Sequence, residues 1–138
     1  MPPSRNAEGD AVAGKRHEEW LKQADYDMDT AEFMLGGGRY FYAVFMCHLA
    51  AEKAVKGLYQ AKLGKPAPKS HNLVLLLSGI GIKPPEGIAK FVARLNQASV
   101  ATRYPDNIAA LQARYGAAVT KAIVSGTKEA LEWIKKQF

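Results

Sequence analysis

The segment from Tyr40 to Leu63 constrains the fold most, because it can form a helix with almost no polar surface. At 100° per residue the segment has two dissimilar faces. A helix that is apolar nearly all round is buried, so this one must be covered on both faces. One face carries only small residues: Ala43, Cys47, Ala50, Ala54, Gly57 and Ala61. The opposite, bulky face carries Phe41, Val44, Phe45, His48, Ala51, Glu52, Val55 and Tyr59.

Two arrangements can bury both faces in a chain of 138 residues. Small side chains allow another helix of the same chain to approach closely on one face. We expect the bulky face to meet a second copy, which predicts a homodimer through this face. In the alternative arrangement, the N-terminal arm or a neighbouring helix of the same chain covers the bulky face.

The rest of the sequence predicts further helices and no strand. Apolar residues recur at spacings of three and four over residues 17–35, 86–98 and 116–136. A short helix is predicted after the N-cap residue Ser70. Residues 102–107 are predicted to form a loop, and residues 108–115 are compatible with a helix or with irregular structure. The predicted fold class is therefore all-α: an up-and-down bundle of four main helices plus one short helix.

Composition sets the domain organisation and excludes several classes of protein. Residues 1–14 lack periodicity and predict a disordered arm before a single folded domain over residues 15–138. The start has no apolar core of a secretory signal, and the longest apolar run, about twelve residues, is shorter than the roughly twenty that span a membrane. One cysteine, Cys47, excludes a disulfide framework and a cysteine-built zinc site, and we expect it to be an inert core thiol. We expect a cytoplasmic protein with no metal and no cofactor.

The charge balance favours an anionic partner. The sequence has 19 Lys and Arg residues against 13 Asp and Glu residues, which gives a net charge of +6. Such an excess favours nucleotides or nucleic acid as ligands. Lys53 and Lys56 lie three residues apart on the thin polar strip of the 40–63 helix, where they can bind a polyanion or remain solvated.

His48 and Glu52 lie one helical turn apart on the bulky face. A histidine among aromatic residues, beside a carboxylate, can take part in proton transfer, because both burial and charge change its pKa. The same pair can instead be a hydrogen-bonded contact that fixes the register of the helix.

Three short runs together indicate a family. Residues 50–58 (AAEKAVKGL), 70–73 (SHNL) and 102–106 (TRYPD) occur in this order, and Trp20–Ala24 precedes them with Asp27, Ala31 and Glu32. This pattern resembles the HEPN (higher eukaryotes and prokaryotes nucleotide-binding) domain family over residues 17–137. The resemblance implies an up-and-down helical bundle that commonly dimerises.

The resemblance also implies a range of functions. Small prokaryotic HEPN proteins are often encoded beside a minimal nucleotidyltransferase, and some of these pairs are toxin–antitoxin systems. Many HEPN proteins are metal-independent ribonucleases, whereas others bind nucleotides or act as non-catalytic partners. The ribonucleases typically carry an arginine followed, after four to six residues, by a histidine. Here eight residues separate Arg39 from His48, and no histidine follows Arg103, so the usual motif is absent and enzymatic activity stays open.

The predicted site combines these signals. Arg103 can bind phosphate through two parallel hydrogen bonds or can pair with Glu52, and Tyr104 can stack on a base. His71 can contact phosphate at a helix start or bond to a backbone carbonyl.

The leading hypothesis is a protein that binds nucleotide or RNA and acts with a nucleotidyltransferase in a toxin–antitoxin-type pair. The alternatives are a metal-independent ribonuclease, with His48, His71 and Arg103 as weak catalytic candidates, and a non-catalytic interaction module. The predicted binding groove contains Glu52, Lys53, Lys56, His71, Arg103, Tyr104 and Asp106.

Overall fold

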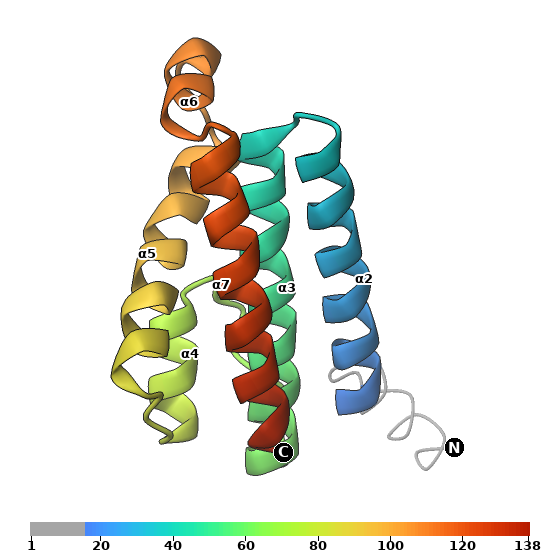
Figure 1. The fold of residues 1–138 in the computed structure, drawn as a ribbon. Coiled ribbons are helices and arrows are strands. Elements are labelled where there is room, and N and C mark those ends of the chain that lie inside the picture. The colour runs from blue at the N-terminus through green and yellow to red at the C-terminus, as the bar shows by residue number, and fades with distance from the viewer. Residues whose placement is uncertain (1–15) are drawn as a thin grey trace, which may run out of the picture.

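A computed structural model describes residues 16–138, which fold into helices without any strand. The four long helices lie side by side and alternate in direction along the chain, while α4 packs beside α5 and α6 lies at one end of the bundle (Figure 1). The all-α bundle is confirmed, with α6 as a second short helix. The predicted arm over residues 1–14 lies outside the described residues. The helices are α2 (His17–Gly36), α3 (Tyr40–Leu63), α4 (Leu73–Ile80), α5 (Glu86–Arg103), α6 (Ile108–Arg114) and α7 (Ala117–Lys136).

Helix α3 is the centre of the bundle, and its small residues do permit a close approach. A Cβ atom added to Gly57 would lie 2.9 Å from Cβ of Trp20 on α2. Cys47 is fully buried on the same face. The expected core position of Cys47 is confirmed, and burial raises the pKa of its thiol to about 11, which disfavours the reactive thiolate.

The prediction that the bulky face of α3 meets a second copy of the chain is wrong. Helices α4, α5 and α7 of the same chain pack against α3. On the bulky face, the Tyr59 ring lies against Gly79 of α4, and the Phe45 ring lies under Arg103 of α5. The alternative, in which neighbouring helices bury the bulky face, is correct, and this face is not free for a second copy. Only Phe45 is half-buried; the other residues of the face, Phe41, Val44, His48, Ala51, Glu52, Val55 and Tyr59, are buried.

Helix α5 is longer than predicted and includes the first two residues of the expected 102–107 loop. The hydroxyls of Ser99 and Thr102 donate to the carbonyls of Asn96 (2.8 Å) and Ala98 (3.0 Å) and thus fit inside the helix. The helix ends at Arg103. The next residue, Tyr104, precedes Pro105, and proline disfavours the helical conformation of the residue before it. Arg103 is therefore held by a helix rather than by a loop.

The two short helices both begin at asparagine caps. Oδ1 of Asn72 accepts from the backbone N–H of Leu75 at 3.1 Å, so α4 starts after Asn72 and not after Ser70. Oδ1 of Asn107 accepts from the N–H of Ala110 at 3.0 Å in the same way and starts α6. No helix among the described residues is long and apolar enough to cross a membrane.

Candidate functional site

Glu52 is a buried carboxylate surrounded by basic side chains. Its Oε2 atom lies 2.9 Å from Nζ of Lys56, one turn along α3. Its Oε1 atom lies 2.9 Å from Nδ1 of His71, which precedes α4, and 3.8 Å from Nδ1 of His48. A buried carboxylate is stable only when such partners compensate for its lost hydration. We call Glu52, His48, Lys56, His71 and Arg103 the Glu52 cluster.

His71 is the exposed member of the cluster, with 62% of its side chain accessible. The expected bond to a backbone carbonyl is replaced by the contact with Glu52. Asn96 on α5 fixes the adjoining backbone: its Oδ1 accepts from the N–H of Leu73 at 2.8 Å, and its Nδ2 donates to Oδ1 of Asn72 at 3.0 Å. Sequence reasoning missed both asparagines, although the cap position of Asn72 before an apolar run was a usable signal.

His48 is fully buried, and the Asn96 side chain and the His71 backbone are its polar neighbours. Burial lowers the pKa of His48, although the nearby Glu52 carboxylate opposes the shift. Because burial dominates, the imidazole is neutral and the contact with Glu52 is no ion pair. The 3.8 Å separation is also too long for a hydrogen bond. His48 is thus closed to a substrate.

Arg103 lies at the end of α5, with its guanidinium carbon 5.0 Å from the centre of the Phe45 ring. The expected alternative, an ion pair with Glu52, is absent among the described residues, because Glu52 pairs with Lys56 and His71 instead. The Nη2 atom of Arg103 is buried without any hydrogen-bond partner in the described part of the chain. A buried donor without an acceptor is costly, and Arg103 as a whole is only half-buried, so a ligand that approaches its open part could supply the acceptor that Nη2 lacks.

Comparison with known proteins identifies the fold. The family model described as the HEPN domain matches residues 17–137, nearly all of the described chain. The chain belongs to the HEPN domain family. Among curated protein sequences, none matches this HEPN chain.

Two solved structures are similar to this HEPN domain. TT1696 from Thermus thermophilus has a TM-score of 0.78 and 26% identity, and the match covers 89% of this chain and 98% of that one. ST0689, an archaeal HEPN homologue, has a TM-score of 0.73 and 32% identity, with the same coverage of the two chains.

The remaining predicted groove residues of this HEPN domain do not join the Glu52 cluster through any described contact. Nζ of Lys53 lies 2.8 Å from Oδ2 of Asp27 on α2, so this lysine is tied to another helix. Tyr104 and Asp106 are exposed beyond the end of α5. The structure therefore brings together Glu52, Lys56 and His71. Arg103 acts electrostatically on His48, which lies beside Glu52, whereas Lys53, Tyr104 and Asp106 lie apart.

The arrangement offers the HEPN domain two kinds of chemistry. Arg103 and Lys56 are cations suited to a phosphate, and His71 presents an exposed imidazole held by a carboxylate. Within residues 16–138, no group of three or more His, Cys, Asp or Glu side chains is arranged to hold a metal ion.

Proposed function

We propose that this HEPN domain binds the phosphate of a nucleotide or RNA at the Glu52 cluster, and that it acts with a nucleotidyltransferase in a toxin–antitoxin-type pair. The observation that carries the proposal is the buried Nη2 of Arg103, which has no acceptor among the described residues. Guanidinium groups bind phosphate through parallel hydrogen bonds, so a phosphate oxygen would supply the missing acceptor.

The charges of the cluster favour the same ligand. Arg103 and Lys56 are positive, whereas Glu52 is the one carboxylate of the cluster, so cations are in excess even when His71 is neutral. The net charge of +6 has the same sign and would attract a polyanion to the whole molecule. The exposed ring of Tyr104, next to Arg103 in sequence, is available for stacking on a base.

Binding of a labelled single-stranded RNA and of a labelled nucleotide, each titrated over a range of salt, tests this proposal. Arg103→Ala should weaken binding about tenfold or more and reduce the salt slope for RNA by about one. Lys53→Ala should have less effect, since Lys53 pairs with Asp27. Lys121→Ala, on the exposed surface of α7, is the matched control. The proposal would be contradicted if Arg103→Ala bound RNA and nucleotide as tightly as the control variant does.

One observation favours metal-independent RNA cleavage as a second function. Glu52 engages Nδ1 of the exposed His71, which leaves Nε2 as the nitrogen able to exchange a proton. A carboxylate that orients an imidazole in this way is the usual support for a general base. Such a base could deprotonate the 2′-hydroxyl of RNA, whose oxygen then bonds to the phosphorus as the bond to the 5′-oxygen breaks. The leaving 5′-oxygen takes a proton from water, while Arg103 stabilises charge on the phosphate.

Incubation with labelled RNA in EDTA tests the cleavage function separately from binding. If the chain is a nuclease, products should appear in EDTA, and His71→Gln should abolish them while RNA binding persists. Glu52→Gln should lower the rate less, because it changes the orientation of His71 without removing the imidazole. Intact RNA at high protein concentration would eliminate the nuclease function and leave the binding function in place.

The partner is the least constrained part of the proposal. A HEPN domain that acts with a nucleotidyltransferase should co-purify with one when the chain is expressed together with the genes that flank its own. We also propose that two copies of the chain associate, through a face other than the covered face of α3. The absence of a nucleotidyltransferase gene beside this one would argue against the toxin–antitoxin-type pair.

A further inference from the structure

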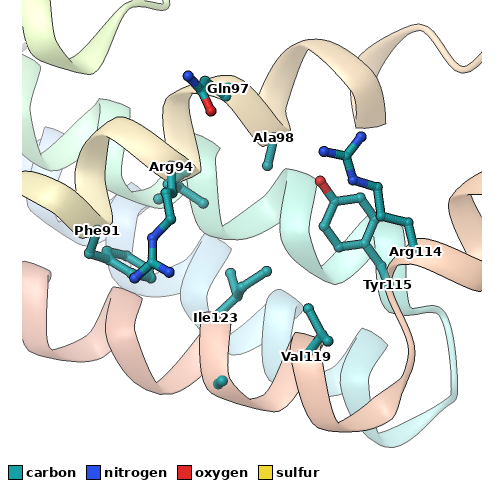
Figure 2. Close-up of a pocket in the computed structure, with 10 residues that line it drawn as sticks. Phe91, Arg94, Gln97, Ala98, Arg114, Tyr115, Val119 and Ile123 are labelled. Atoms are coloured by element: carbon teal, nitrogen blue, oxygen red, sulfur yellow. The ribbon is translucent and has the colours of Figure 1, made fainter.

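A cavity of about 530 Å³ lies between α5, α6 and α7 (Figure 2). It shares no lining residue with the Glu52 cluster and is not used by the proposed function. Its volume is in the range that small-molecule sites occupy, about 300–1,000 Å³. The cavity combines apolar side chains, including Phe91, Val119 and Ile123, with two arginines.

The arginines, Arg94 and Arg114, give the cavity a positive charge without compensation. No carboxylate lines the cavity, and neither arginine forms an ion pair with an acidic side chain among residues 16–138. Arg114 instead has its guanidinium carbon 5.8 Å from the centre of the Tyr115 ring. In Figure 2, Arg94 lies with Phe91 toward one end of the cavity, and Arg114 lies with Tyr115 toward the other. Cations in a concave site with apolar walls attract anions strongly.

The part of the cavity wall formed by α5 and α7 is held in place by close packing. A Cβ atom added to Gly126 on α7 would lie only 2.5 Å from Cε1 of Phe91, so the Phe91 ring lies directly against the α7 backbone. Tyr115 at the other end is buried. A wall that is already fixed loses little conformational freedom when a ligand binds.

We propose that this cavity binds a small amphipathic organic anion. The apolar body of the ligand packs against Phe91, Val119 and Ile123, and its carboxylate or phosphate binds Arg94 or Arg114. Guanidinium groups recognise both anions through paired hydrogen bonds, so an aliphatic carboxylate and a nucleoside monophosphate share the required chemistry.

Two fluorescent probes test the proposal on the full-length chain. 1-Anilinonaphthalene-8-sulfonate combines an aromatic body with an anion, and N-phenyl-1-naphthylamine has the same body without the charge. The sulfonate should bind saturably at one site, and Arg94→Ala or Arg114→Ala should weaken its binding about tenfold. Binding of the neutral probe should not change. Lys90→Ala, one turn before Arg94 on α5 and outside the cavity, is the control.

A second variant and a competition identify the site and the ligand class. Ala122→Phe should fill the cavity and prevent binding of both probes, with circular dichroism to verify that the bundle is intact. If dodecanoate alone displaces the sulfonate, the ligand class is an aliphatic carboxylate. If adenosine monophosphate displaces it, the ligand class is a nucleotide. The proposal would be overturned if neither competitor displaced the sulfonate. It would also be overturned if the arginine variants bound the sulfonate as tightly as the control does. Unchanged RNA binding by Arg94→Ala would separate this site from the Glu52 cluster.

Discussion

Glu52 determines the stability of its cluster, because its buried carboxylate pairs with Lys56 and His71. Glu52→Gln removes the negative charge and leaves the Lys56 ammonium, itself largely buried, without a counterion. Breaking a buried pair is costly, so the free energy of unfolding should fall by about 1–3 kcal/mol in a urea titration.

Glu86→Gln is the matched control for this substitution. Glu86 pairs with Lys90 across one exposed turn of α5 at 3.0 Å. Exposed pairs contribute little, and the change should stay within about 0.5 kcal/mol. Equal losses in the two variants would mean that Glu52 is no more important than a surface residue.

His48 should make the stability of the protein depend on pH. Burial lowers the pKa of His48 below its ordinary value, so the folded chain keeps it neutral. As the pH falls through about 6.5, the unfolded chain protonates this histidine and the folded chain does not. The unfolded state then binds more protons, and the free energy of unfolding falls with pH.

Urea titrations of His48→Gln and the wild type at several pH values measure this contribution. Between about pH 7.5 and 5.5 the wild type should lose more stability than the variant, by at most about 1.4 kcal/mol per pH unit. Above about pH 7.5 the difference between the two should be constant, since His48 is neutral in both states. Parallel curves over the whole range would show that the folded and unfolded chains protonate His48 alike, and that burial does not lower its pKa.

The packing of α3 on α2 depends on the missing side chain of Gly57. Gly57→Ala places a Cβ 2.9 Å from Cβ of Trp20, and the two helices must move apart. Overpacking of this kind costs about 1–3 kcal/mol, visible as a lower thermal midpoint. Gly87→Ala in the first turn of α5 meets no atom within 4 Å and should instead stabilise the chain by about 0.5–1 kcal/mol. Destabilisation of similar size in both variants would refute the packing explanation.

The two asparagine caps should differ in their effects. Asn72 caps α4 and also accepts a hydrogen bond from Asn96 on α5, so Asn72→Ala should lower the free energy of unfolding by about 1–2 kcal/mol. Asn107 caps only the seven-residue α6, which makes few contacts with the bundle. Asn107→Ala should therefore accelerate hydrogen exchange within α6 with little global loss. Global losses of equal size would show that α6 unfolds together with the core.

Local patterns were sufficient to predict the helices but not their ends or their neighbours. The bounds of the 40–63 helix are as predicted, because Gly64 and the prolines after it end the helix unambiguously. The end of α5 was missed, since Ser99 and Thr102 are weak helix formers that here bond back to the helix. The pattern of α3 predicted burial of its bulky face, yet the residues that cover it belong to helices distant in sequence.

The contacts of Glu52 were predictable where neighbours in sequence or a family resemblance indicated them. Glu52 and Lys56 are one turn apart, and the resemblance added His71. The tie between Asn96 and Asn72 joins residues 24 apart and leaves no local signal. Nor does a sequence indicate that Arg94 and Arg114 line one cavity, because that depends on how α5 and α6 pack.

Association of two HEPN chains would have to use a face that the bundle leaves open. Tyr26 and Phe33 are seven residues apart on α2, two turns along one face, and are 74% and 78% exposed. Exposed aromatic side chains on one face favour association, so we expect the dimer contact there. Tyr104, at the end of α5, is exposed to a similar extent, 76%, and serves as a comparison.

Sedimentation equilibrium at tens of micromolar tests this interface. The wild type should sediment as a dimer, Phe33→Glu should sediment as a monomer because a buried carboxylate would lack a partner, and Tyr104→Glu should remain a dimer. A monomeric wild type would eliminate the homodimer altogether. If Tyr104→Glu were monomeric and Phe33→Glu dimeric, the interface would instead lie at the end of α5, beside Arg103. A second copy would then border the proposed phosphate site.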